Sequence, residues 1–316
     1  MSLPHPTLRS CVAITVALAA TILAPAATMP AAANHLERII GPEEPARNFP
    51  AAFMALLPDD RQQEIAERPK WSDPRIGGWG GVWGPACKPG KVRQRPVIFV
   101  HGNTEDASFW NAPPSGTTIV NVRDAFVQAG YCENEIWAIS YTGRKGYFTY
   151  NDINTRELEA FVNAVLEYTK AREVDVVAHS LGVTVVRKAA FNSPEFYRRM
   201  ASFVAIAGAN DGTTTCRGAG EAKVSHVCEE VHPGSAWLET LNGAGETPPG
   251  PRYLTIYDGS GVADQFYLGP DAASPRLDGA CNFAMPGTAH NTLARGETAV
   301  RTYLAFIRDG KEPTCA

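Results

Sequence analysis

The segment Val174–Gly182, with the sequence VDVVAHSLG, is an apolar run that stops abruptly at a serine between two small residues. A run of this length that is rich in β-branched residues is typical of a strand buried on both faces. The residues that follow, Val183–Ala190, continue as a helix candidate. A strand and a helix can pass closely around Ser180 because Ala178 and Gly182 are small, and such a strained turn exposes the serine hydroxyl. The segment therefore predicts Ser180 as a nucleophile.

Apolar strand candidates alternate with amphipathic helix candidates along the rest of the chain. This alternation predicts the α/β class, with a mostly parallel central sheet and helices on both faces. Further strands are expected at residues 96–100, 135–141, 202–207, 252–257 and 281–285, and helices at 119–130, 154–170 and 291–308.

The N-terminus has the pattern of a secretory signal peptide over residues 1–33. His5 and Arg9 precede the apolar run Cys11–Leu23, and small residues at 31–33 offer a cleavage site. The alternative is a membrane anchor, but the run is short for a full span and no second long apolar run follows. We therefore expect a secreted or periplasmic protein with no stable membrane insertion.

Two regions are expected after the signal peptide. Residues 34–90 are irregular and rich in proline, and they predict an extension packed on the core; residues 91–316 predict one catalytic domain. The extension holds a helix candidate at Pro58–Glu67 and a Gly/Trp patch with Trp79 and Trp83. These tryptophans either pack in glycine-rich turns or bind a surface or polymer.

Six cysteines remain once the signal peptide is removed. An even number in an exported chain favours disulfides, and no spacing typical of a zinc site occurs, so no metal is predicted. The expected pairs are Cys87 with Cys132, Cys216 with Cys228, and Cys281 with Cys315. The net charge of −4 gives no electrostatic reason to expect a nucleic acid partner or an anionic membrane surface.

A serine nucleophile needs a base, usually a histidine that a carboxylate orients. In a fold of this kind the acid and the base follow the serine in the chain. Of the seven histidines, only His290 comes after the strand expected to deliver the acid. For the acid, Asp264 is favoured over Asp258 because a residue further into the loop reaches His290 more easily. The other aspartate is expected to cap a turn.

Two backbone N–H groups, those of Asn103 and Leu181, are the candidates for an oxyanion hole. Asn103 follows the strand at 96–100, and Leu181 begins the helix after Ser180. His101 and His179 are expected to be structural residues that form hydrogen bonds.

This set of motifs resembles the secreted bacterial class 2 lipases, and almost as closely the extracellular polyhydroxybutyrate depolymerases. The matching pieces are Val97–Asn103, Val176–Gly182, Pro233–Asn242, Tyr253–Asp264 and Gly287–His290. The resemblance implies an α/β-hydrolase fold without a separate lid domain and a serine carboxylic-ester hydrolase.

The expected activity is lipase or esterase catalysis by a Ser180–His290–Asp264 triad, without a cofactor and in a monomer. Phe109 and Trp110 are candidates to line the acyl pocket, and Phe266 and Tyr267 the side near the acid. A polyester depolymerase is the first alternative. An amidase or peptidase, or a non-catalytic binding module on the same fold, is the second.

Overall fold

The computed structural model describes residues 49–58, 77–82, 92–116, 118–141, 150–220, 222, 223 and 225–316. The predicted signal peptide, Trp83, Cys87 and all but the first residue of the helix candidate Pro58–Glu67 lie outside these ranges.

The described strands form one sheet in the order β1-β3-β2-β4-β5-β6-β7. Neighbouring strands are parallel throughout, except that β1 runs antiparallel to β3 at one edge. The mostly parallel sheet expected from the sequence is confirmed. Its strands are β1 (Gly78–Gly80), β2 (Val97–Val100), β3 (Ile136–Ile139), β4 (Val174–His179), β5 (Met200–Ile206), β6 (Arg252–Tyr257) and β7 (Cys281–Ala284).

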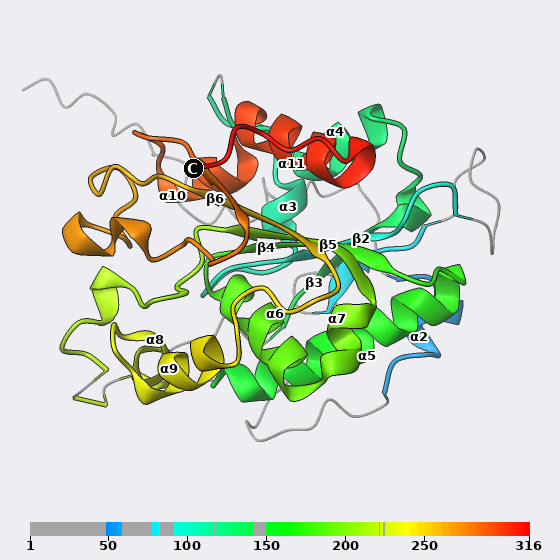
Figure 1. Ribbon diagram of the computed structural model, residues 1–316. Coiled ribbons are helices and arrows are strands. Elements are labelled where there is room, and N and C mark those ends of the chain that lie inside the picture. The colour runs from blue at the N-terminus through cyan, green and yellow to red at the C-terminus, as the bar shows by residue number, and fades with distance from the viewer. Residues whose placement is uncertain are drawn as a thin grey trace, which may run out of the picture.

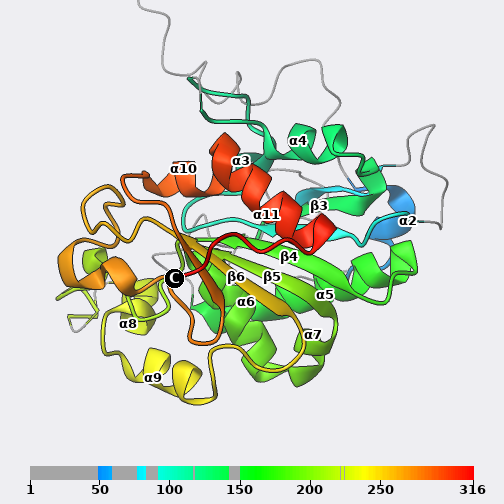
Figure 2. The ribbon, with the colours of Figure 1, turned by 45° about the horizontal axis from the view of Figure 1, so that its top comes forward.

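Helices cover both faces of the sheet, as Figures 1 and 2 show. One face carries α2 (Ala51–Met54), α5 (Asn151–Thr169), α6 (Leu181–Asn192) and α7 (Pro194–Arg198). The other carries α3 (Ser108–Asn111), α4 (Val122–Gln128), α10 (His290–Arg295) and α11 (Glu297–Asp309). Between β5 and β6 the chain forms α8 (His226–Val231) and α9 (Ala236–Gly243).

Successive residues of β2 serve two separate hydrophobic cores. Val97 and Phe99 pack with α4 and α11, whereas Ile98 and Val100 pack with α5 and α6. All four are fully buried, because side chains alternate between the faces of a strand and both faces are covered. Each such side chain contributes about 1.5–3 kcal/mol by leaving water. The rigid strand ends that result are what position the site.

The edge strand β1 comes from the Gly/Trp patch and was not expected from the sequence. Gly78 has a φ of +119°, and a Cβ there would lie 2.1 Å from the carbonyl oxygen of Ala138. Only glycine allows this close pairing. Trp79 is buried, and its Nε1 donates a hydrogen bond to the Ala107 carbonyl at 2.8 Å. Trp79 therefore packs in the core and is not available to bind a polymer surface.

The closing helix expected at 291–308 is two helices, which corrects that prediction. The break is at Gly296, whose ψ of 140° is extended. Gly296 pairs with Ile119 in an isolated bridge, and the N–H of Val120 donates to the Arg295 carbonyl at 2.9 Å. The segment 118–120 thus takes backbone hydrogen bonds that a continuous helix would have used. For the same reason α4 begins only at Val122 and not at residue 119.

Candidate active site

The site lies at the carboxyl ends of β2 and β4. These strands are neighbours, and β3 lies on the opposite side of β2, so the direction of the strand order changes here. Open α/β sheets bind ligands in the crevice at such a point. The residues that follow β2 are His101–Asn103, and the residue that follows β4 is Ser180.

Ser180 occupies a strained turn between β4 and α6. Its backbone has φ 54° and ψ −126°, a conformation that residues with a side chain rarely adopt and that is found at functional sites. Gly182 explains how the turn fits against β2, because a Cβ there would lie 2.4 Å from the carbonyl oxygen of His101. The small residue two positions after Ser180 therefore has a direct steric cause.

The loop after β2 passes directly beside the serine. A Cβ on Gly102 would lie 2.9 Å from the Cβ of Ser180. The next residue, Asn103, lines the same cavity as Ser180 and Leu181. The structure therefore brings both predicted oxyanion residues to the serine.

His290 is the first residue of α10 and lies beside the acid loop after β6. Its Nδ1 is 2.8 Å from Oδ2 of Asp264, and both side chains are almost completely buried. The His290 ring also contacts the ring of His179, the residue before Ser180, with 4.5 Å between ring centroids. Two segments far apart in the chain thus bring the predicted base and acid into contact, next to the segment that carries the predicted nucleophile.

The environment of His290 favours its neutral form. Burial lowers the pKa of this imidazole, and His179 beside it lowers the pKa further. The carboxylate of Asp264 raises the pKa, but the net pKa lies below the usual 6.5. A neutral imidazole is the form that a general base requires at neutral pH.

Asp258 clamps the two loops that carry Asp264 and His290. Its Oδ1 accepts hydrogen bonds from the N–H groups of Gly287 at 2.6 Å and Thr288 at 3.2 Å. Its Oδ2 accepts from Ser260 and from the N–H of Ala263. Burial acts to raise the pKa of Asp258, but these hydrogen bonds outweigh it and hold the pKa below its usual value. The aspartate not favoured as the acid thus holds both loops.

Glu105, for which the sequence predicts no role, joins the loop after β2 to β4. Its Oε2 accepts a hydrogen bond from the N–H of Gly102 at 2.9 Å and lies 3.4 Å from Nδ1 of His179. Burial acts to raise the pKa of Glu105, but His179 and the Gly102 N–H lower it below its usual value. Its position in the sequence could have revealed it, because this carboxylate lies only three residues after Gly102, the glycine that approaches the serine.

His101 is a buried part of the framework. Its Nδ1 lies 2.8 Å from the Gly102 carbonyl, and its ring stacks on Tyr141 with 4.1 Å between centroids. Burial lowers the pKa of His101, which favours the neutral imidazole. These contacts fit the structural role expected from the sequence.

The sequence matches the class 2 lipase family over residues 94–265, which is more than half of the chain. The chain belongs to the class 2 lipase family. The match includes Ser180, Asp258 and Asp264 but ends before His290. Membership in this family, together with the fold, makes the protein an ester hydrolase of the lipase/esterase type.

Two solved structures have the same fold as this class 2 lipase. The mature form of the Bacillus licheniformis lipase BlEst2 is 14% identical, with a TM-score of 0.56 over 73% of this chain and 97% of that one. Aspergillus fumigatus lipase B is also 14% identical, with a TM-score of 0.54 over 69% of this chain and 53% of that one. At this identity the likeness concerns the α/β-hydrolase fold.

The four aromatic residues predicted to line the pocket of this class 2 lipase divide into two groups. Trp110 is fully buried and packs against Phe99 in the core, and Phe109 stacks on His179 with 5.0 Å between centroids. Neither belongs to the residues that line the cavity beside Ser180. Phe266 and Tyr267 do line it. The cavity therefore lies on the acid-loop side of the serine. Trp110 lies in the core and not in its wall, and a pocket role for Phe109 stays a prediction.

Two of the predicted disulfides, Cys216–Cys228 and Cys281–Cys315, are confirmed in the lipase. Cys132 is also disulfide-bonded, but its pairing with Cys87 stays a prediction because Cys87 lies outside the described residues. Disulfides of this kind fit an extracellular enzyme. Within the described ranges, no helix combines the length and apolar character needed to cross a bilayer.

Proposed function

We propose that Ser180 is the nucleophile, His290 the general base and Asp264 the acid of a catalytic triad that hydrolyses carboxylic esters. The observation that carries this proposal is the 2.8 Å contact between buried His290 and Asp264 beside a serine in a strained turn. An Asp264 carboxylate at Nδ1 fixes the tautomer in which Nε2 is free to accept a proton.

The reaction proceeds in two halves. Ser180 Oγ attacks the ester carbonyl while His290 takes the hydroxyl proton, and the N–H groups of Asn103 and Leu181 stabilise the oxyanion. The tetrahedral intermediate expels the alcohol, which receives the proton from His290, and an acyl-enzyme remains. Water then attacks the acyl carbon with His290 again as base, which releases the carboxylic acid and restores Ser180.

The enzyme is proposed to act outside the cytoplasm as a monomer, after removal of residues 1–33. A complete set of candidate catalytic and oxyanion residues within one chain supports the monomer. The signal pattern and the disulfides support export. Sizing chromatography of the secreted protein and sequencing of its N-terminus would test both statements.

Labelling with a fluorophosphonate tests the nucleophile directly. This probe reacts with activated serines, so we expect modification of Ser180 in the wild type and none after His290→Ala. Ser225→Ala is the matched control, because Ser225 lines the same cavity but its hydroxyl accepts a hydrogen bond from the N–H of Cys228. Modification of a serine other than Ser180, or labelling that survives His290→Ala, would refute the proposal.

A further inference from the structure

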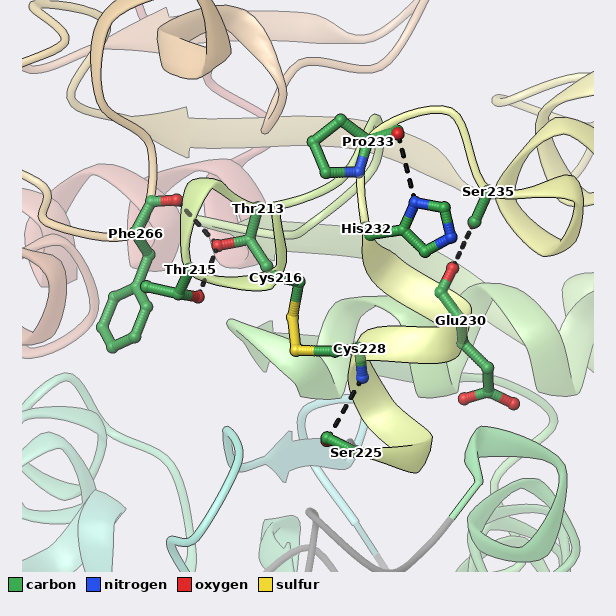
Figure 3. Close-up of a disulfide and its surroundings, with 10 residues drawn as sticks. All are labelled: Thr213, Thr215, Cys216, Ser225, Cys228, Glu230, His232, Pro233, Ser235 and Phe266. Atoms are coloured by element: carbon green, nitrogen blue, oxygen red, sulfur yellow. Dashed lines mark hydrogen bonds between the residues drawn. A yellow bond between two sulfur atoms is a disulfide. The ribbon is translucent and has the colours of Figure 1, made fainter. Parts of the chain in front are cut away.

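A cavity of about 250 Å³ opens beside Ser180. Its walls come from the segment that carries the Cys216–Cys228 disulfide and from the acid loop with Phe266 and Tyr267. Figure 3 shows the disulfide and, beside its segment, Phe266. Its lining is Asn103, Ser180, Leu181, Ala209, Thr213, Thr215, Cys216, Ala219, Ser225, Val227, Cys228, Val231, Phe266 and Tyr267.

The disulfide wall is fastened to the acid loop by hydrogen bonds. The carbonyl of Phe266 accepts from Thr213 Oγ1 at 2.7 Å and from the N–H of Thr214 at 2.9 Å. Further along, Asp271 accepts from Thr214 Oγ1 at 2.8 Å and from Arg217 Nε at 3.0 Å. The N–H of Phe266 in turn donates to Oδ1 of Asp264 at 3.0 Å. The wall is therefore held in a fixed position relative to the predicted acid.

The chemistry of the lining suits a hydrocarbon chain. It includes alanine and valine side chains, the disulfide and two aromatic rings, and among the described residues that line it none is charged. The hydroxyl of Thr213 donates a hydrogen bond to the Phe266 carbonyl, and that of Ser225 accepts one from the N–H of Cys228, as Figure 3 shows. Burial of apolar surface is thus the main source of binding energy in this cavity.

The cavity lies on the acyl side of the proposed reaction centre. It is lined by Ser180 and by both oxyanion residues, Asn103 and Leu181, whereas His290 is not among its lining residues. In the proposed mechanism the base must reach the leaving alcohol, and the acyl group stays bonded to the serine. The cavity therefore receives the acyl group.

We infer that this enzyme is specific for esters of short- and medium-chain fatty acids, and that the disulfide-bonded wall sets the limit on chain length. A volume of 250 Å³ holds about eight groups of the size of a water molecule, so acyl chains longer than about eight carbons exceed the cavity. The inference rests on the proposed function, because it takes Ser180 as the acylated residue.

Chain-length profiles test this inference with p-nitrophenyl esters from acetate to palmitate. The wild type is expected to have its highest kcat/KM at eight carbons or fewer. Ala219→Leu fills the cavity and should lower the octanoate-to-acetate ratio of kcat/KM about tenfold. Val227→Ala enlarges the cavity and should raise the laurate-to-hexanoate ratio about tenfold. Both sizes are at the lower end of the roughly 10–200-fold effect of one methylene in an apolar pocket. The matched controls Ala236→Leu and Val262→Ala change exposed positions and should leave both ratios unchanged.

The possible results distinguish failure of the chain-length inference from failure of the proposed catalytic mechanism. Ratios that shift at least threefold in the stated directions support the inference. A smaller shift in either folded variant, or a wild-type optimum above eight carbons, overturns it while the enzyme remains an active esterase. A wild type without turnover of any ester would instead refute the proposed function. If Ala219→Leu does not fold, Val227→Ala decides alone, because it removes only two methyl groups.

Discussion

At the scale of single residues, the site separates two aspartates that the sequence placed only six positions apart. Asp264 contacts His290, and Asp258 holds the backbone on both sides of that pair. A chain-order argument selects both as candidates, but only the loop geometry divides their roles. Asp258 is a positioning residue in the proposed mechanism, because it acts through Gly287 and Ala263.

Substitution of Asp258 tests that positioning role. Asp258→Ala leaves several N–H groups without their acceptor, so we expect a loss of about 1–3 kcal/mol in unfolding free energy. Misplacement of His290 should lower kcat about 10–100-fold with little change in KM. Asp278→Ala, at an exposed position of the same region, is the control for both measurements. Unchanged kcat in a folded Asp258→Ala variant would contradict the role.

The acid limb of the pH profile reports His290. Only the neutral imidazole can take the Ser180 proton, so kcat/KM must fall as the pH drops through the pKa of His290. Burial and His179 hold that pKa below 6.5, and we expect the limb below pH 6.5. Asp264→Asn removes the carboxylate that raises the pKa, so the limb should move to lower pH while kcat falls about 10³–10⁴-fold. An acid limb at pH 7 or above would contradict this assignment.

At the scale of secondary structure elements, α8 is joined to the start of α5 by one buried carboxylate. Oε2 of Glu230 accepts hydrogen bonds from the backbone N–H and Nδ2 of Asn151, at 2.8 and 2.7 Å. Burial raises the pKa of Glu230 to about 7; Asp152 nearby adds to the rise, and Lys188 opposes it. Between pH 4.5 and about 7, Glu230 is therefore protonated in the folded protein and ionised in the unfolded chain.

This protonation makes stability depend on pH. Between the unfolded pKa of 4.5 and the folded pKa of about 7, the folded state binds more protons, so unfolding free energy falls as pH rises. Glu230→Gln keeps an acceptor for Asn151 without the titration. As the pH rises from 4.5 to 7, the unfolding free energy of this variant should increase by on the order of 2–3 kcal/mol relative to that of the wild type. Urea unfolding across that range measures it, and a constant difference between the two proteins would argue against a raised pKa.

The sequence predicted those elements whose signal is local. Long apolar runs such as Val97–Val100 and Val174–Ala178 are buried on both faces, and each became a central strand. Strand β1 escaped prediction because three residues, Gly-Trp-Gly, carry no alternation and pair only through long-range contact with β3. The helix break at Gly296 likewise depends on hydrogen bonds from segment 118–120, which lies far away in the sequence.

The residues of the site likewise divide into those with a local signal in the sequence and those that depend on long-range contacts. Ser180, Asp264 and His290 could be chosen from motif and chain order, because the fold fixes where strand ends deliver side chains. The cavity lining could not be chosen, because the position of the disulfide wall depends on hydrogen bonds from Thr213 and Thr214 to Phe266. Those bonds join segments about fifty residues apart and leave no periodic pattern in the sequence.

At the scale of the whole molecule, the Cys281–Cys315 disulfide ties the C-terminal tail to β7. The two cysteines are 34 residues apart in the chain, so the bond restricts a long loop of the unfolded state. Neither cysteine is among the residues of the cavity or the proposed triad. This bond is therefore expected to stabilise the fold without contributing to turnover.

Removal of that disulfide separates stability from catalysis. A Cys281→Ala/Cys315→Ala double variant should lose about 3–4 kcal/mol of unfolding free energy, from the loop-closure entropy of a loop of this length. Its kcat/KM on p-nitrophenyl butyrate at 25 °C should stay within twofold of wild type. Urea unfolding and initial rates measure the two quantities. A large loss of activity in the folded variant would show that the C-terminal tail affects the site.

Every step of the proposed mechanism depends on Ser180, the group that forms a bond to the substrate. The most direct test of this role is the turnover of p-nitrophenyl butyrate by Ser180→Ala, with circular dichroism to establish that the variant is folded. We predict a kcat less than a thousandth of the wild-type value, because loss of a triad nucleophile removes covalent catalysis and leaves only oxyanion stabilisation and binding. A folded variant that keeps more than that fraction would contradict the role of Ser180 as nucleophile.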